Sequence, residues 1–256
     1  MLSPQILLSF DVEEFDLPLE YGQSIPIGEQ LRVGYAGLVA LEPLLQEVRA
    51  TLFTTAYFAS QYAPALRGLS ERHEIASHTY YHTRFEESHL LASRQLLQEV
   101  SGQEVTGLRM PRMRDVRPAA VLEAGYTYNS SVNPTWIPGR YNNLRVPRRP
   151  FREEGLLEFP VSVTPKWRIP LFWLAFKNFP YAYFLRLVRH TLRQEGYVCL
   201  YFHPWEFTDI RRYQLPGYVR RDCGPALVQK LERLVKDLGK EGQFVTMAEY
   251  VRNIQY

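Results

Sequence analysis

Two histidines four residues apart, His78 and His82, have a spacing that is typical of metal-binding motifs. If residues 77–82 form a helical turn, the two Cβ atoms would lie about 5–6 Å apart and both imidazoles could reach one ion. Two histidines that hydrogen-bond only to protein groups are the alternative, because this spacing is common. The interpretation as a metal site therefore depends on whether the chain also supplies an acidic ligand, a base and an acid.

An acidic cluster follows the first apolar run of the chain. Residues 5–10 are almost continuously apolar, as in a central parallel strand that is covered on both faces. Asp11, Glu13, Glu14 and Asp16 follow directly. Because side chains alternate along a strand, Asp11 and Glu13 should point to one side and Glu14 to the other. A solvated acidic turn is the alternative interpretation.

Two further polar residues, Arg109 and His203, stand at the ends of predicted strands, at residues 105–109 and 197–202. In parallel α/β folds the functional groups lie at the carboxyl ends of the strands. We therefore expect the acidic cluster, the histidine pair, Arg109 and His203 to converge on one rim of the sheet. A histidine that merely caps a strand end is the alternative for His203.

Seven or eight predicted strands alternate with helices along the chain. The remaining strands are expected at residues 51–58, 73–76, 126–131, 156–163 and 244–246, and the helices at 36–49, 88–100, 117–124, 181–195 and 225–238. Residues 17–34 and 132–155 are expected to be irregular, and Pro43 should kink or restart the helix around it. The alternation predicts a mostly parallel sheet, closed or open, in a single domain over residues 1–256.

The composition excludes several classes of protein. Apolar residues make up 46% of the chain, which argues against global disorder. The net charge of +3 is too balanced to predict a nucleic-acid partner. Cys199 and Cys223 form no CxxC motif and no disulfide framework. The first residues lack the basic region of a signal peptide and no apolar stretch approaches the about 18–20 residues that span a bilayer, so the cytoplasm is the expected location.

In combination, the motifs resemble the polysaccharide deacetylases of the NodB-homology type, which are similar to carbohydrate esterase family 4. The similar segments occur in the family's order over nearly the whole chain: SFD at 9–11 (family TFDD), SHTYYH at 77–82 (H-[ST]-x-x-H), RMP at 109–111 (R-x-P) and LYFH at 200–203 (L-x-x-H). The resemblance implies a distorted (β/α) barrel with about seven parallel strands. It also implies metal-dependent removal of acetyl from N-acetylated sugars.

The resemblance implies a metal site with one departure from the family pattern. The family's second aspartate, a metal ligand, aligns with Val12, which cannot coordinate a cation. Glu13 is the nearest acid on the side of Asp11, so the expected ligands of a divalent ion, with zinc the first expectation, are Glu13, His78 and His82.

The resemblance also implies catalytic roles. Asp11, held by Arg109, would be the general base, His203 would protonate the leaving amine, and the backbone N–H of Arg112 would bind the oxyanion. Asn129 stands where the family has an aspartate that orients the acid histidine, so the support of His203 is open. The residues that could stack on a sugar are Trp205, Tyr80 and Tyr81, and core packing is the alternative for the two tyrosines.

The chain looks closest to the branch associated with cytoplasmic assembly of surface polysaccharides such as O-antigen, which implies a lipid- or nucleotide-linked substrate. The stretch from Trp167 to Phe176 would then be a lid or a contact with the inner face of the membrane, unless it is buried core. Two rival functions use the same motifs. One is an amidohydrolase on a small cyclic amide or imide, favoured by a closed pocket. The other is a carbohydrate-binding pseudoenzyme that lost its metal with the aspartate at position 12.

Overall fold

A nine-stranded, mostly parallel sheet lies at the centre of the computed structural model, which describes residues 3–254. Seven strands are consecutive parallel neighbours in the order β10, β1, β2, β3, β4, β5, β9, while β8 pairs antiparallel with β9 and β11 pairs parallel with β1. Their bounds are β1 Gln5–Val12, β2 Thr51–Thr54, β3 Glu74–Ser77, β4 Gly107–Leu108, β5 Tyr128–Asn129, β8 Phe151–Glu153, β9 Leu156–Glu158, β10 Tyr197–Phe202 and β11 Gln243–Phe244.

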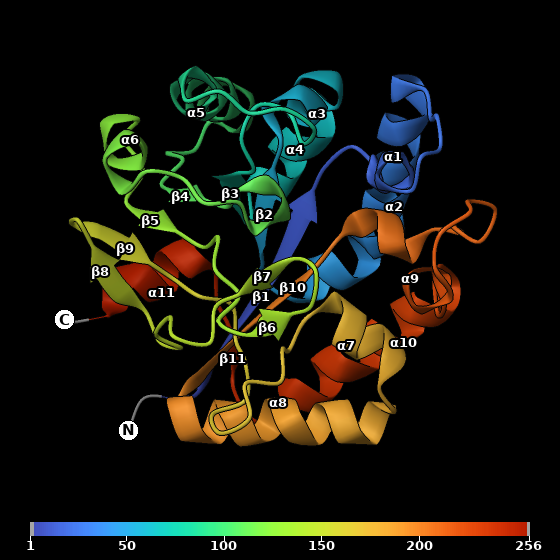
Figure 1. Cartoon of the computed structure of the whole chain (residues 1–256), viewed down its shortest axis with the longest axis vertical. Coiled ribbons are helices and arrows are strands. Elements are labelled where there is room, and N and C mark those ends of the chain that lie inside the picture. Colours follow the sequence, from blue (N-terminus) through green and yellow to red (C-terminus); the bar gives the residue numbers. More distant parts are fainter. Residues whose placement is uncertain (1–2, 255–256) are drawn as a thin grey trace.

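Helices surround the sheet (Figure 1). Helix α10 is amphipathic, because its buried residues recur with helical spacing, and it packs on α2, α8 and η2. The helices are α1 Leu17–Glu20, α2 Ile27–Glu47, α3 Ala56–Gln61, α4 Ala63–Ser70, α5 Ser88–Ser101, α6 Pro118–Glu123, α7 Trp173–Asn178, α8 Tyr181–Glu195, α9 Gly217–Arg220, α10 Pro225–Leu238 and α11 Met247–Asn253, with 3-10 turns η1 Pro111–Met113 and η2 Pro204–Phe207. Within residues 3–254, no helix is long and apolar enough to cross a membrane.

The gap between β9 and β10 is bridged by the chain that follows β9. The Ser162 N–H donates to the Cys199 carbonyl over 3.0 Å, and the Cys199 N–H donates to Ser162 Oγ over 2.8 Å. Within residues 3–254, β9 and β10 are not paired as strands, so the two sides meet through irregular contacts and the barrel is distorted. The fold predicted from the motifs is therefore confirmed.

The prediction of an irregular segment over residues 17–34 was wrong. Helix α2 begins at Ile27 and runs through Pro43 to Glu47. Two glycines of this helix permit close packing rather than a turn. A Cβ at Gly34 would overlap the carbonyl oxygen of Glu13, and one at Gly37 would overlap that of Pro204.

Two other predicted segments also differ from the structure. The predicted strand over residues 51–58 ends at Thr54, and helix α3 follows. The excursion over 132–155 contains a short hairpin of β6 Trp136–Ile137 and β7 Tyr141–Asn142, followed by β8. By contrast, the helix predicted over 181–195 coincides with α8.

Candidate metal and acid–base site

Strand β1 delivers the acidic residues to the carboxyl edge of the sheet. Asp11 belongs to the strand and Glu13 follows it, and both side chains are buried. Glu14 points elsewhere, since its Oε2 accepts a 2.6 Å hydrogen bond from Thr55 Oγ1. This arrangement agrees with the predicted alternation along the strand.

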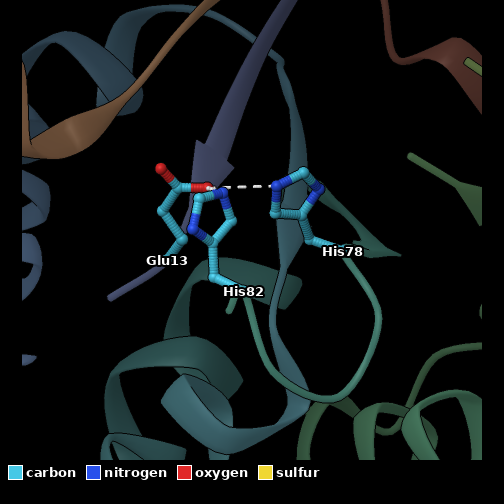
Figure 2. Close-up of side chains that lie close together, drawn as sticks. All are labelled: Glu13, His78 and His82. Atoms are coloured by element: carbon cyan, nitrogen blue, oxygen red, sulfur yellow. Dashed lines mark ion pairs between the residues drawn. The ribbon is translucent and has the colours of Figure 1, made fainter. Parts of the chain in front are cut away.

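Glu13, His78 and His82 come together as one buried group. Glu13 Oε2 lies 3.0 Å from Nε2 of each histidine, and the three possible ligand atoms all lie within 4.8 Å of one another. Figure 2 shows the Glu13 carboxylate pointing to the two imidazole rings. The histidines lie on a loop and not on the helical turn that their spacing predicted. Thr79 has a φ of 60°, and this left-handed residue turns the chain after β3.

The second nitrogen of each imidazole is held by the protein. His78 Nδ1 lies 2.8 Å from the Arg109 carbonyl, and His82 Nδ1 lies 2.8 Å from Asp16 Oδ1. Both acceptors favour a proton on Nδ1, so Nε2, the atom that faces Glu13, is the one that each imidazole can offer to a cation. Asp16 is held in turn by Arg112, whose Nη2 lies 2.8 Å from Asp16 Oδ2.

This donor set fits a divalent cation. Glu13 Oε2 is buried and, within residues 3–254, has no hydrogen-bond partner, although two imidazole nitrogens face it. Trp205 Nε1 donates to the other oxygen, Glu13 Oε1, over 3.0 Å and so orients the carboxylate. Two imidazoles and one carboxylate are a ligand set found in catalytic zinc sites.

Glu13 and His82 each shift the pKa of the other. Burial opposes ionisation of Glu13, but His82 and the contacts with both histidines outweigh it and hold the pKa of this carboxyl well below its usual range. Burial also disfavours a charged His82, yet Glu13 and Asp16 raise the pKa of His82 to about 10. A carboxylate that is ionised at neutral pH suits a cation ligand.

Arg109 and Asp11 form the buried ion pair that the motifs predicted. Arg109 Nη1 lies 2.7 Å from Asp11 Oδ1 and 3.0 Å from Ser9 Oγ. The guanidinium is fully buried, its Nε and Nη2 donate to Ser130, and it stacks 4.0 Å above the ring of Phe53. These contacts fix Asp11 in one orientation at the edge of the pocket.

His203 is supported by Glu206 and not by Asn129. Its Nδ1 lies 3.0 Å from Glu206 Oε1, whereas Asn129 donates to Glu158. Burial favours the neutral imidazole, but the bond to Glu206 and the charges of Glu13, Glu206 and Asp11 together outweigh it and raise the pKa of His203. His203 Nε2 lies 3.8 Å from Asp11 Oδ2. The sequence analysis missed Glu206, although its position three residues after a strand-end histidine matches a capping box.

A buried lysine stands behind Glu206. Lys177 Nζ, from α7, lies 3.7 Å from Glu206 Oε2, and both side chains are fully buried. The sequence analysis also missed Lys177, because no local pattern distinguishes a buried lysine from the exposed ones of a helix.

Five of the site residues line a pocket of about 340 Å³, namely Asp11, Glu13, His78, His82 and His203. Its aromatic lining includes Tyr141, Phe172, Trp173, Tyr201, Trp205 and Tyr218. Trp205 is in this lining, but Tyr81 is outside it and packs on Tyr57 and Tyr80. The Arg112 side chain also reaches the pocket, and its backbone φ of 57° makes a tight turn after β4.

The stretch from Trp167 to Phe176 divides between core and surface. Leu171, Phe172 and Phe176 are buried, so these side chains are not available to a membrane. Trp167 is 75% exposed, and Lys166 Nζ lies 5.3 Å from its ring centroid. Trp173 packs edge-on against His203, with 5.2 Å between the ring centroids.

Comparison with known proteins identifies the fold. The structure resembles two proteins designated polysaccharide deacetylases. For the one from Mycobacterium smegmatis the TM-score is 0.66 and the identity 18%, with 98% of this chain and 90% of that chain covered. For the one from Pseudomonas aeruginosa PAO1 the TM-score is 0.65 and the identity 17%, with 97% of this chain and 89% of that chain covered. It also resembles the Puue allantoinase, with a TM-score of 0.60, 15% identity, and coverage of 97% of this chain and 89% of that chain.

At the level of sequence, residues 130–252 match a family described as Domain of unknown function (DUF3473), and no curated protein matches the chain. The protein therefore has the NodB-like (β/α) barrel fold of the polysaccharide deacetylases, with a Glu-His-His group at the carboxyl edge of its sheet.

Proposed function

We propose that the protein is a metal-dependent hydrolase that removes acetyl from an N-acetylated sugar of a surface polysaccharide or its precursor. One observation carries the proposal: a cation-binding group, an arginine-held carboxylate and a glutamate-held histidine face one pocket. Glu13 belongs to the first of these, Asp11 is the carboxylate and His203 is the histidine. The fold likeness to proteins designated polysaccharide deacetylases supports the choice of reaction.

Glu13, His78 and His82 would hold the cation, with zinc expected. When bound there, a divalent cation acts as a Lewis acid toward the acetyl carbonyl and makes water a better nucleophile. Asp11 accepts the proton that the attacking water loses, and Arg109 keeps this carboxylate aimed into the pocket. The backbone N–H of Arg112, at the turn after β4, is the proposed donor to the oxyanion.

His203 supplies the proton that the leaving nitrogen needs. A C–O bond to water's oxygen forms, the amide C–N bond breaks, and the products are acetate and a free amine on the sugar. An unprotonated amine anion is a very poor leaving group, so the acid is essential for an amide. Glu206 raises the pKa of His203, which favours the protonated imidazole before transfer.

Acetate release in the presence of added zinc, measured on a panel of nucleotide-linked and lipid-linked N-acetyl sugars, tests the proposal. Asp11→Ala and His203→Ala should each lower the rate by about 10²–10⁴-fold with little change in bound metal. Near-normal rates for Asp11→Ala would contradict its role as the base. Protein that binds no zinc at millimolar concentration would favour the pseudoenzyme.

An amidohydrolase that acts on a small cyclic amide is the second candidate. It is favoured by the similarity to the Puue allantoinase and by the small volume of the pocket. The same chemistry would open a ring amide and not release acetate. Assaying allantoin beside the N-acetyl sugars separates the two candidates.

The cytoplasmic location, the O-antigen branch and the lipid or nucleotide carrier stay predictions from the sequence. For contact with the inner face of a membrane, the exposed Trp167 beside Lys166 is the part of the aromatic stretch that is open to solvent. Burial of Phe172 and Phe176 restricts any such contact to the loop before α7.

A further inference from the structure

The pocket is enclosed by four segments that follow the carboxyl ends of the strands or lie beside them. They are α1 with the residues up to 23, the β6–β7 hairpin with its flanks, residues 164–178, and residues 214–220 around α9. Each segment contributes to the lining, for example through Glu20, Tyr141, Trp173 and Tyr218. We call these four segments the rim.

On two sides, side-chain contacts tie neighbouring segments of the rim together. Glu20 of α1 binds Arg140 of the hairpin, with 2.7 Å between Oε2 and Nη2, and its other oxygen lies 2.6 Å from Arg112 Nε. The hairpin is tied to the third segment, because Thr135 Oγ1 donates to the Arg168 carbonyl over 2.7 Å. Arg168 Nη1 donates to the Pro134 carbonyl over 2.9 Å.

The other two sides are closed in the same way. Asn178 Nδ2, at the end of α7, donates to the Tyr218 carbonyl of α9 over 2.9 Å. Gln23 and Gln214 exchange two hydrogen bonds of 2.9 Å, which join the chain after α1 to the chain before α9. The hydroxyl groups of Tyr21 and Tyr218 lie 3.5 Å apart across the same junction. The four contacts thus form a continuous ring around the pocket.

A polymer bound through an internal unit must leave a site in two directions, and this ring leaves no open side for either exit. The pocket volume of about 340 Å³ is near the lower end of the roughly 300–1,000 Å³ found for small-molecule sites. We infer that the pocket takes a single N-acetylated sugar, or the terminal unit of a short chain, end-on. This inference rests on the proposed deacetylase function and narrows its substrate class.

Oligomers of N-acetylglucosamine from one to five units test the inference with the zinc-loaded, full-length protein. The wild type should remove one acetyl group from the pentamer, at a terminal unit, as read by tandem mass spectrometry. Units outside the pocket make no contact with it, so kcat/KM should differ by less than about threefold between dimer and pentamer. Removal of internal acetyl groups, or a rise of kcat/KM by about tenfold with length, would overturn the inference while leaving the deacetylase function intact.

A variant pair tests the ring itself. Arg140→Ala removes the link from α1 to the hairpin and should allow internal or repeated deacetylation of the pentamer. Arg145→Ala is the matched control, since Arg145 is exposed, follows the same hairpin and is outside the pocket lining. Equal product patterns for both variants would show that the ring does not select the substrate.

A binding measurement covers the case in which no acetate is released. Saturation-transfer NMR on the chelator-treated wild type, with the same pentamer, should show transfer to one terminal unit. Even transfer along the chain, or no binding of any oligomer, would overturn the inference. End-on binding without hydrolysis under zinc would support it and count against the deacetylase function.

Discussion

Replacing Lys177 by methionine should strongly destabilise the protein, because it removes the positive charge that faces Oε2 of the buried Glu206 carboxylate. Nζ and Oε2 lie 3.7 Å apart in a fully buried environment. At an effective dielectric constant of about 20, two unit charges at that separation attract by about 4 kcal/mol. Removing one partner of a buried pair typically costs about 3–5 kcal/mol. For a chain of this size the melting temperature should fall by roughly 10 °C.

The pair can be separated from general damage to the core by a double-mutant cycle. Glu206→Gln alone should also destabilise, whereas Lys177→Met with Glu206→Gln should recover most of the loss because neither charge remains. Lys230→Met is the control, since Lys230 contacts a half-exposed Asp222 and should cost less than about 1 kcal/mol. Chemical denaturation gives the free energies of unfolding. A coupling energy below about 0.5 kcal/mol would refute the ion-pair argument.

Glu206 should also control the pKa of His203, the proposed acid. Glu206→Gln replaces a charge-assisted contact at His203 Nδ1 by a neutral one, a difference of about 1 kcal/mol or about one pKa unit. The pKa of His203 should therefore fall. The proposed acid works in its protonated form, and with a lower pKa it would lose its proton at a lower pH than in the wild type. The basic limb of the pH–rate profile should therefore shift to lower pH. An unchanged limb with full activity would show that Glu206 does not tune His203.

Three further predictions follow from named contacts. Glu13→Ala should lower zinc occupancy and activity together, while Glu14→Ala, whose carboxylate bonds Thr55, should spare bound zinc as measured by metal analysis; equal losses would contradict the ligand assignment. Gly37→Ala should reduce both activity and melting temperature, because its Cβ would overlap the Pro204 carbonyl; Gly28→Ala, in open space on the same helix, should be neutral or stabilising by up to about 1 kcal/mol. Burial raises the pKa of Glu158 to about 7, so the folded state holds a proton there that the unfolded state releases from about pH 4.5. Stability should therefore fall by up to about 3 kcal/mol as the pH rises through 7, and Glu158→Gln should flatten this dependence in denaturation at several pH values.

Much of the site could be predicted because several of its residues follow local rules. The alternation along β1 places Asp11 and Glu13 on one side and Glu14 on the other, as the structure shows. The helix predicted over residues 181–195 has the same bounds as α8. The positions of Arg109 and His203 at strand ends predicted that both would reach one edge of the sheet.

Other parts depend on contacts between distant segments, which local patterns do not encode. Glycines and prolines between residues 17 and 34 suggested a loop, although Gly34 lies inside α2 and packs closely on the Glu13 carbonyl. The residue that supports His203 is Glu206, three residues later in the turn that follows it, and not Asn129. Lys177 of α7 lies behind Glu206. The rim is held by hydrogen bonds such as that between Gln23 and Gln214, which join residues far apart in the chain.

Helix α2 contacts both the backbone of Glu13 and the turn that follows His203. Gly34 and Gly37 are three residues apart and lie on one face of the helix, against the backbone of Glu13 and of Pro204 respectively. Trp205, directly after Pro204, donates to the Glu13 carboxylate from the other direction. Helix α2 and the Trp205 indole thus both link the proposed ligand Glu13 to the turn that follows the proposed acid His203. Any side chain at position 37 would push η2 outward, so it would move His203 and the partner of Glu13 in the same step.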